Sequence, residues 1–327
     1  MCRPPPVAER KNGGPEVSSP PRLTIGLPVY NGENYLAESI ESLLGQTYED
    51  FELVISDNAS TDGTPDICED FRKQDRRIRY FRQQRNIGLS PNHNFTAAKA
   101  RGELFKWASH DDLYGRDLLK LCVEALDEHP DVVLAHSWTA RIDGTGQVVK
   151  AEEYPLETSS PAAPVRFRST LFATGGDDDG GVIRADVLRR IAPYGSYYHA
   201  DRTAISELVL YGRFYQVPQW LFFRRDHAER AEWKFSDARS WCANLDPKRA
   251  NAFRNPLVRL YLEYVWAYVS AIHRAPLTRA DRRDCYRDLL DWAISRVRHG
   301  DLGDLPAGVA VEIDMKSLVP GKGSAGK

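Results

Sequence analysis

The sequence has little cysteine and no pair of cysteines at a spacing that suits a metal. Its five cysteines lie far apart along 327 residues, at Cys2, Cys68, Cys122, Cys242 and Cys285. Without a CxxC pair, the sequence indicates neither a zinc site nor a disulfide framework. This use of cysteine predicts a reducing, cytoplasmic setting.

The sequence also lacks long apolar runs and a large excess of charge of one sign. No run approaches the ~20 residues that a membrane-spanning helix needs, so no transmembrane segment is predicted. The net charge is -2, from 44 basic and 46 acidic residues, which excludes the strongly basic balance typical of nucleic-acid-binding proteins. The chain has 327 residues, long enough for one large domain or two smaller ones, and its 42% of hydrophobic residues is ample for a core.

The two ends of the chain have compositions that do not favour a packed core. Residues 1–21 are rich in proline and glycine and carry no secretory signal, so we expect a disordered arm. Residues 316–327 end in a stretch rich in glycine and lysine, and we expect a flexible tail.

Between residues 22 and 140, short apolar runs alternate with segments of helical periodicity. Leu36, Ile40, Leu43 and Leu44 recur at helical spacing before Gly45. This order predicts an α/β fold with a largely parallel sheet and helices on both faces. The predicted strands are Leu23–Leu27, Phe51–Ser56, Ile78–Arg82, Leu104–Trp107 and Val132–Trp138, and the other predicted helices are Thr64–Arg72, Ser90–Ala100 and Asp117–His129.

Beyond residue 140 the periodicity is weaker. Residues 143–165 contain three prolines and predict turns and loop. A helix is expected over Arg202–Tyr211, followed by two short strands, Phe214–Val217 and Leu221–Arg224. Two longer helices are expected over Leu257–His273 and Arg279–Val297. The second has an apolar stripe of Tyr286, Leu289, Leu290, Ala293, Ile294 and Val297.

The pair Asp111 and Asp112 follows the predicted strand Leu104–Trp107 directly. In a parallel sheet, ligands bind at the carboxyl ends of the strands, so this position is suited to chemistry. Two adjacent carboxylates repel each other unless a cation neutralises them, and hard divalent cations prefer oxygen ligands. A simple turn, in which aspartate is also common, is the alternative for this pair alone.

Polar residues follow the other strands as well. The carrying segments are Leu27-Pro28-Val29-Tyr30-Asn31, Asp57-Asn58-Ala59-Ser60-Thr61-Asp62-Gly63, Asn86-Ile87-Gly88 with Asn94, and Asp111-Asp112. Taken in this order, the four loops resemble the nucleotide-sugar-binding half of GT-A glycosyltransferases, and in particular the inverting bacterial family 2. The resemblance is strong over residues 22–140 and moderate over 175–230.

The resemblance implies a GT-A fold and a division of roles along the chain. Residues 22–140 would bind the nucleotide sugar, residues 141–235 the acceptor, and residues 236–315 would form a C-terminal helical region. It implies these donor-binding residues: Pro28, Tyr30, Asn31, Asp57, Asn86, Asp111 and Arg225. Asp57 would face the base and Asp111 the ribose.

The resemblance also implies a divalent cation, Mn²⁺ or Mg²⁺, on the donor diphosphate. Asp112 would hold it, with His227 as a further ligand. Here Ser109 and His110 precede the acid pair, where many relatives have a further acid. For Arg225 and His227, a solvated surface turn is the alternative.

The general base implied by the resemblance is Asp201, at the start of the helix that precedes Gly212. It would remove the proton from the acceptor hydroxyl during inverting transfer. Ala200 occupies the position of the glutamate that often accompanies this aspartate. Asp201 also suits the N-cap of the helix, and the two roles are compatible.

Several other residues invite a functional interpretation. Asp177, Asp178 and Asp179 resemble a metal site, although flanking glycines and like charges favour a solvated or acceptor-side loop. His93 follows the turn at Asn86 where relatives carry a basic residue, and exposed Arg85 is a weak substitute. Trp220 and Trp233 would line a sugar pocket or pack in the core.

The predicted helix Leu257–His273 is rich in tyrosine and tryptophan. Three arrangements are open: packing on the transferase domain, forming a homodimer surface, or lying at a lipid interface, where aromatic residues are favoured.

The resulting hypothesis is an inverting glycosyltransferase. It would move a sugar from a UDP or dTDP donor to a hydroxyl of a small-molecule, lipid-linked or polysaccharide acceptor. A nucleotidyltransferase is disfavoured because no glycine-rich loop follows the first strand. A degenerate nucleotide-sugar-binding module without transfer activity is the alternative.

Overall fold

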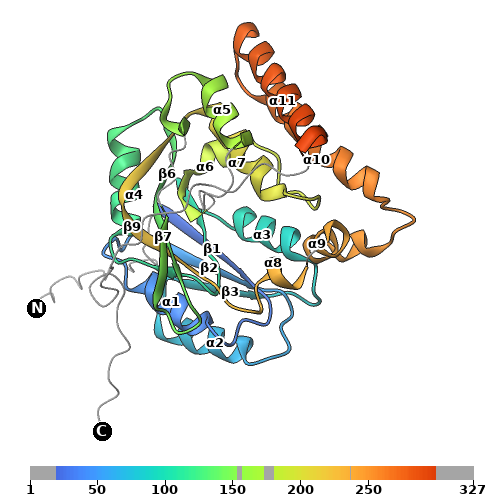
Figure 1. Ribbon diagram of the computed structural model, residues 1–327. Coiled ribbons are helices and arrows are strands. Elements are labelled where there is room, and N and C mark those ends of the chain that lie inside the picture. Colours follow the sequence, from blue (N-terminus) through green and yellow to red (C-terminus); the bar gives the residue numbers. More distant parts are fainter. Residues whose placement is uncertain (1–19, 153–156, 173–179, 236, 300–327) are drawn as a thin grey trace, which may run out of the picture.

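The computed structural model describes residues 20–152, 157–172, 180–235 and 237–299. Within these ranges, nine strands form one mixed sheet in the order β3-β2-β1-β4-β8-β6-β9-β5, and β7 pairs with β6. Figure 1 shows helices on both sides of this sheet. The predicted α/β class is confirmed, while the arm predicted for 1–21 (apart from its last two residues) and the tail lie outside the described residues.

The first half of the sheet is parallel, as predicted. β1 pairs with both β2 and β4, and β2 pairs with β3. Gly26 of β1 allows α3 to approach closely, because a Cβ there would come within 2.6 Å of the Thr96 hydroxyl. The elements are β1 (Leu23–Val29), α1 (Leu36–Leu44), β2 (Phe51–Asp57), α2 (Thr64–Gln74), β3 (Ile78–Arg82), α3 (Leu89–Ala98) and β4 (Leu104–Trp107).

The second half contains antiparallel pairs that the sequence did not predict. β8 runs antiparallel to β4 and β6, β7 to β6, and β5 to β9. Its elements are β5 (Leu113–Tyr114), α4 (Leu118–Glu128), β6 (Val132–Ile142), β7 (Val148–Glu152), η1 (Glu157–Ser159), α5 (Ala163–Phe172), β8 (Val182–Arg184), α6 (Ala185–Leu188), α7 (Ala200–Tyr211) and β9 (Arg213–Arg225).

Two predictions in this half are wrong. Residues 143–165 are not continuous loop, because β7 lies within them and α5 begins there. Pro164 is compatible with α5 because it lies in the first turn, where a helix needs no backbone N–H donor. The two strands expected after Gly212 are one strand, β9, paired in parallel with β6.

An irregularity in the β6–β9 pairing explains why β9 looked like two strands. Ser137 pairs with Val217, but the next pair joins Trp138 to Trp220. Pro218 therefore lies in the interruption of the ladder, where its missing N–H removes no strand hydrogen bond.

Helices cover the two faces of the sheet and enclose two cores. The first core lies between the sheet and α1, α2 and α4, and it includes Leu27, Ile40 and Leu119. The second lies between the other face and α5, α7, α10 (Leu257–Arg274) and α11 (Arg279–His299), and it includes Phe214 and Tyr268. The remaining elements are α8 (Ala231–Lys234), α9 (Ala238–Leu245) and η3 (Pro247–Ala250).

The C-terminal helices pack on the second core as a pair. Arg274 of α10 forms two 2.9 Å hydrogen bonds to the buried carboxylate of Glu207 on α7. The stripe predicted for α11 is only partly right: Leu289 is buried, but Tyr286, Leu290 and Ile294 are exposed. Among the described helices, none has an apolar stretch long enough to cross a bilayer.

Candidate active site

The carboxyl ends of β1, β2, β3 and β4 meet at one edge of the sheet. Val29, the last residue of β1, pairs with Asp57, the last residue of β2. Asp57 in turn pairs with Arg82 of β3. On the other side of β1, Gly26 is the partner of Trp107 at the end of β4. This arrangement brings together the four loops that carry the predicted donor site.

Hydrogen bonds join the first loop to the second. The Asn31 side-chain oxygen accepts from the backbone N–H of Thr61 at 2.9 Å. The backbone N–H of Asn31 donates to the Ser60 hydroxyl at 2.9 Å. Asn31 has a φ of 50°, a left-handed conformation that asparagine tolerates well. Tyr30 beside it is exposed, so both side chains are available at the sheet edge.

The second loop is joined to the third by one amide. The Asn58 side chain donates to the Asn86 oxygen at 3.0 Å and accepts from the Ile87 N–H at 2.8 Å. Asn86 is itself exposed. The predicted donor residues Tyr30, Asn31 and Asn86 therefore lie on the same connected set of loops.

Two of the predicted donor residues are buried in the wall of this edge. Pro28 lies inside β1. Asp57 is fully buried, and its oxygens accept from the Ser60 N–H at 2.8 Å and the Tyr80 hydroxyl at 2.9 Å. In this structure Pro28 is part of the first strand, Asp57 holds the loop after the second strand, and neither side chain reaches the surface.

The fourth loop carries the acid pair and packs against the first. A Cβ on Gly32 would come within 2.5 Å of the His110 ring, so this close approach requires glycine. The Asp111 carboxylate accepts from the Ser109 hydroxyl at 2.6 Å. The Asp112 carboxylate accepts from the backbone N–H of Arg225 at 2.9 Å. Both aspartates are almost completely buried.

Arg225 lies beside the acid pair and is buried. Its side chain is fully buried, and its guanidinium donates to the Asp111 carbonyl at 2.8 Å, the Gly144 carbonyl at 3.2 Å and the Glu38 carboxylate at 2.9 Å. It also lies 4.4 Å from the centre of the Tyr35 ring. The side chain is buried and each guanidinium nitrogen donates to the protein, which excludes the solvated surface turn for Arg225. Its contact with a diphosphate stays a prediction. Arg225 positions the acid pair.

His227 lies beside the acid pair, where it contacts Asp111. Its Nε2 is 3.0 Å from an Asp111 oxygen, and its ring packs 4.9 Å from that of Tyr35. His227 thus contacts Asp111 directly, and the expectation that Asp112 and His227 hold one cation stays a prediction. Arg230, which the sequence did not single out, lies 3.5 Å from an Asp112 oxygen.

The electrostatics of the two aspartates differ although they are neighbours. Burial alone raises the pKa of both carboxyl groups. For Asp111, nearby His110, the hydrogen bond with His227 and the charge of Arg230 outweigh burial and hold the pKa well below its usual range. For Asp112, burial and repulsion from Asp111 raise the pKa to about 7.

The donor set around Asp111 fits a divalent cation that is shared with a diphosphate. Within residues 20–152, 157–172, 180–235 and 237–299, no three His, Cys, Asp or Glu side chains form a metal cage by themselves. Asp111 and His227 nevertheless place a carboxylate and an imidazole side by side. Magnesium is typically held by one or two carboxylates, with substrate phosphates and water completing its shell.

Asp201 lies in the first turn of α7 and is half-buried. The N-cap of this helix is His199, in a left-handed conformation with φ 55°, so the capping role considered for Asp201 is wrong. The positive end of the helix dipole favours a negative charge at this position.

The aromatic residues near α3 form a cluster around His93. His93 stacks on Tyr194 with 5.3 Å between ring centres, and its Nδ1 lies 2.9 Å from the Leu89 carbonyl. Burial lowers the pKa of His93 to about 4. It is therefore neutral at physiological pH and supplies no cation for a diphosphate.

The remaining candidates lie apart from this arrangement. Trp220 packs against Trp138 at 4.5 Å between ring centres, so it belongs to the packing of β6 on β9. Asp177, Asp178 and Asp179 lie outside the described residues, and so does the side chain of Trp233. Arg85 is exposed.

The matches with known proteins agree with this geometry. The family model described as Glycosyl transferase family 2 matches residues 24–191, just over half of the chain. The chain belongs to glycosyl transferase family 2. The matched region of this family 2 protein contains all four strand-end loops.

Relatives of the family 2 protein include two glycosyltransferases of Streptococcus pneumoniae serotype 4. GlyG is 29% identical over 160 residues, which are 46% of this chain and 53% of that protein. GlyA is 33% identical over 108 residues, which are 33% of this chain and 15% of that protein. The chain thus spans about half, or less, of the length of these curated relatives.

Solved structures show the same fold. S. aureus TarS 1-349 in complex with UDP-GlcNAc superposes with a TM-score of 0.62 at 18% identity, covering 85% of this chain and 74% of that one. The mannosyltransferase PcManGT from Pyrobaculum calidifontis, in complex with GDP-Man and Mn²⁺, gives 0.50 at 17% identity, with 90% and 92% covered. The predicted GT-A fold with a helical C-terminal region is confirmed.

Proposed function

We propose that this family 2 protein transfers a sugar from a nucleoside-diphosphate donor to an acceptor hydroxyl, with inversion at the anomeric carbon and with the help of a divalent cation. The observation that carries the proposal is the joining of four strand-end loops at one edge of the sheet, with Asp111 of the fourth loop paired with His227. Residues 22–140 would hold the donor and residues 141–235 the acceptor.

Exposed side chains on the loops suit the nucleoside. Tyr30 offers a ring face, and Asn31 and Asn86 offer amide groups, all at the same sheet edge. Short polar side chains and aromatic rings are common partners of ribose hydroxyls and bases. Asp57, buried beneath them, holds the second loop in place, and a direct contact with the base would require it to exchange its Ser60 or Tyr80 partner. We favour UDP or dTDP as the donor nucleotide.

The acid pair suits the diphosphate end of the donor. Asp111, Asp112 and His227 would hold Mn²⁺ or Mg²⁺, which when bound neutralises negative charge on the diphosphate. Arg230, 3.5 Å from Asp112, adds positive charge where the diphosphate leaves. Arg225, itself held by Glu38, keeps Asp111 and Asp112 in position through hydrogen bonds to both residues.

The transfer step itself needs one proton acceptor. Asp201 would take the proton of the acceptor hydroxyl as its oxygen forms a bond to the anomeric carbon. The bond between that carbon and the diphosphate oxygen breaks, and the nucleoside diphosphate leaves with the electron pair. The acceptor oxygen then carries the sugar with inverted configuration.

A nucleotide panel tests the donor site. The melting temperature would be measured with UDP, dTDP, GDP or CMP, each with Mn²⁺, Mg²⁺ or EDTA. A ligand at 100 times its Kd stabilises the native state by ~2.7 kcal/mol, which raises the melting temperature by several degrees. We expect this rise with UDP or dTDP only when the cation is present. A rise with GDP alone would overturn the base preference, and no rise with any nucleotide would contradict the donor site.

Asp201→Asn separates binding from transfer. We expect the variant to bind the donor as the wild type does and to lose transfer by at least ~100-fold, because the amide cannot accept the proton. Calorimetry with the nucleotide and a donor-turnover assay measure the two quantities. Asp66→Asn, which removes a first-turn aspartate from α2, is the matched control for the loss of a helix-dipole contact. Transfer that survives in Asp201→Asn would place the base elsewhere, and donor binding without any turnover in the wild type would favour a degenerate module.

A further inference from the structure

Helix α10 has one face inside the protein and one face outside. Leu260, Tyr264 and Tyr268 are buried, and the last two pack on Trp292 of α11 at 5.5 and 5.3 Å between ring centres. This half of the helix confirms the expected packing on the transferase domain. Packing in the core explains why these buried positions of α10 are apolar, but it does not explain the apolar residues on the exposed face.

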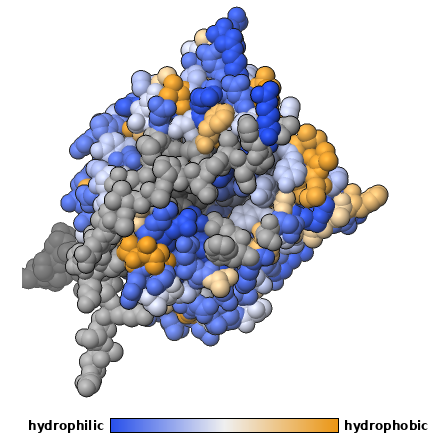
Figure 2. Space-filling model, viewed as in Figure 1, coloured by the Kyte–Doolittle hydropathy of each residue, from blue (hydrophilic) through white to orange (hydrophobic). Residues whose placement is uncertain are grey.

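The outward face is apolar as well. Phe253, in the loop before α10, is 96% exposed, and Leu262 and Trp266 on the helix are 62% and 68% exposed. Val258 lies between them along the chain and is equally open. These four residues define what we call the α10 edge. Figure 2 shows hydrophobic colour gathered over α10 and the projecting loop before it.

Basic groups surround the α10 edge. Lys248 of η3 and Arg254 of the loop that carries Phe253 are exposed and make no ion pair among the described residues. This region has two acids, Asp246 before η3 and Glu263 on α10. Glu263 is shared by two arginines, Arg249 at 2.7 Å and Arg259 at 2.8 Å. We call these charged residues the rim of the α10 edge. The rim has more basic than acidic side chains, with Lys248, Arg249, Arg254 and Arg259 against Asp246 and Glu263.

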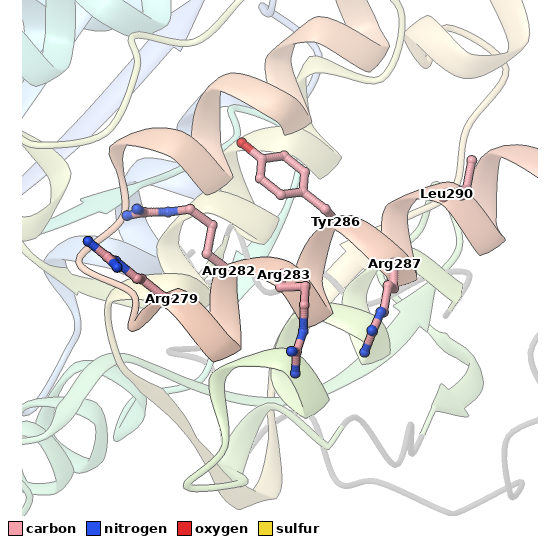
Figure 3. A pocket seen from close by; sticks show the side chains of 6 residues that line it. All are labelled: Arg279, Arg282, Arg283, Tyr286, Arg287 and Leu290. Carbon is pink, nitrogen blue, oxygen red and sulfur yellow. The ribbon is translucent and has the colours of Figure 1, made fainter.

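Helix α11 continues the basic character. An open groove of about 490 Å³ on it is lined by six residues, seen in Figure 3. Tyr286 and Leu290 supply its apolar part. Its arginines outnumber their acidic partners, since Arg283 and Arg287 share Asp284. The remaining lining residues are Arg279 and Arg282.

The charge around the edge decides between the two possible occupants. In a two-fold dimer, the same patch meets itself, so the basic rim of one copy would face the basic rim of the other. That arrangement is repulsive. A bilayer with anionic lipids offers apolar chains to the edge and negative headgroups to the rim, and tryptophan is favoured at such interfaces.

We propose that the α10 edge docks on the surface of a lipid bilayer that carries anionic headgroups. Phe253, Val258, Leu262 and Trp266 enter the boundary between headgroups and acyl chains, and the basic rim contacts the headgroups. No segment crosses the bilayer in this arrangement. The docking is independent of the proposed transfer reaction, because it uses no residue of the strand-end site.

Vesicle flotation of the full chain tests the proposal. We expect the wild type to float with phosphatidylcholine vesicles that contain a quarter of phosphatidylglycerol, and to bind pure phosphatidylcholine vesicles much more weakly. Phe253→Ser combined with Leu262→Ser and Trp266→Ser should lower binding at least ~10-fold because the apolar contact is lost. Arg254→Gln should lower binding only to the anionic vesicles, by about fivefold.

Val149→Ser is the matched control, since it removes an exposed apolar side chain from β7, outside the C-terminal helices. All substituted side chains are exposed, so the melting temperature and its rise with nucleotide should remain those of the wild type. Absence of wild-type flotation with the anionic vesicles would overturn the proposal, as would equal flotation of the triple variant. If the wild type forms a dimer and binds no vesicles, and the triple variant is monomeric, the edge binds a second copy of the chain and the proposal is wrong.

Discussion

Asp112→Asn should abolish cation-dependent donor binding and leave the fold intact. Asp112 is buried beside Asp111, and its carboxylate accepts from the backbone N–H of Arg225. The amide oxygen of asparagine can accept the same hydrogen bond, so the local backbone keeps its partner. The charge that would hold the cation is lost.

The expected sizes of the two effects differ strongly. Removing one of two adjacent buried carboxylates relieves their repulsion, so we expect the free energy of unfolding to stay within ~1 kcal/mol or to rise. Transfer and nucleotide affinity in the presence of Mn²⁺ or Mg²⁺ should each fall by about 100- to 1,000-fold, as for other losses of charge stabilisation in active sites.

Calorimetry with the preferred nucleotide, with cation or with EDTA, measures the affinity, and urea unfolding measures the stability. Asp70→Asn serves as the control, because this aspartate is exposed on the surface of α2 and its ion pair is with Lys73, which is exposed as well. If Asp112→Asn binds nucleotide and cation as the wild type does, Asp112 is no metal ligand and the cation role proposed for the acid pair is wrong.

The first half of the fold was predictable because its signals are local. β3 and β4 have the predicted bounds, and β1 and β2 differ by one or two residues at their ends. In β1, β2 and β4, short apolar runs end near polar or glycine residues, and the sheet buries nearly all of these strands. The helices between them begin and end at residues that sequence rules recognise, such as Pro65 and Gly45.

The second half was less predictable because tertiary contacts override its local signals. Pro218 suggested the end of a strand, yet β9 continues because the proline lies at an irregularity in its pairing with β6. In α11, the apolar residues alone do not reveal which side is buried. Cys285, Leu289 and Trp292 face the core, while Leu290 remains exposed.

The site divides in the same way. The strand-end motifs identified Asp111, Asp112 and His227, and the structure does bring them together. What the sequence could not give is which group each of them contacts. The contact between Arg225 and Glu38 joins residues 187 positions apart, and no local pattern announces it. From the sequence alone, Arg224 and Arg225 at the end of β9 could as well be exposed to solvent as buried.

Arg225→Lys should lower the free energy of unfolding by about 3 to 5 kcal/mol, the usual result of breaking a buried ion pair from one side. The guanidinium has three separate partners: the Glu38 carboxylate and the Asp111 and Gly144 carbonyls. A lysine ammonium cannot reach all three, because it lacks the planar fork of arginine. Nucleotide binding should fall as well, since the backbone of Asp111 loses its support.

Arg213→Lys provides the comparison, because Arg213 lies at the start of the same strand and pairs with Asp131 near the surface. An exposed pair contributes at most about 1 kcal/mol, so this variant should be nearly as stable as the wild type. Urea unfolding of both variants measures the difference. Glu38→Gln, which keeps a hydrogen-bond acceptor for Arg225, should fall between them and remains informative if Arg225→Lys does not fold. Equal, small effects at Arg225 and Arg213 would mean that the buried guanidinium does not hold the acid pair.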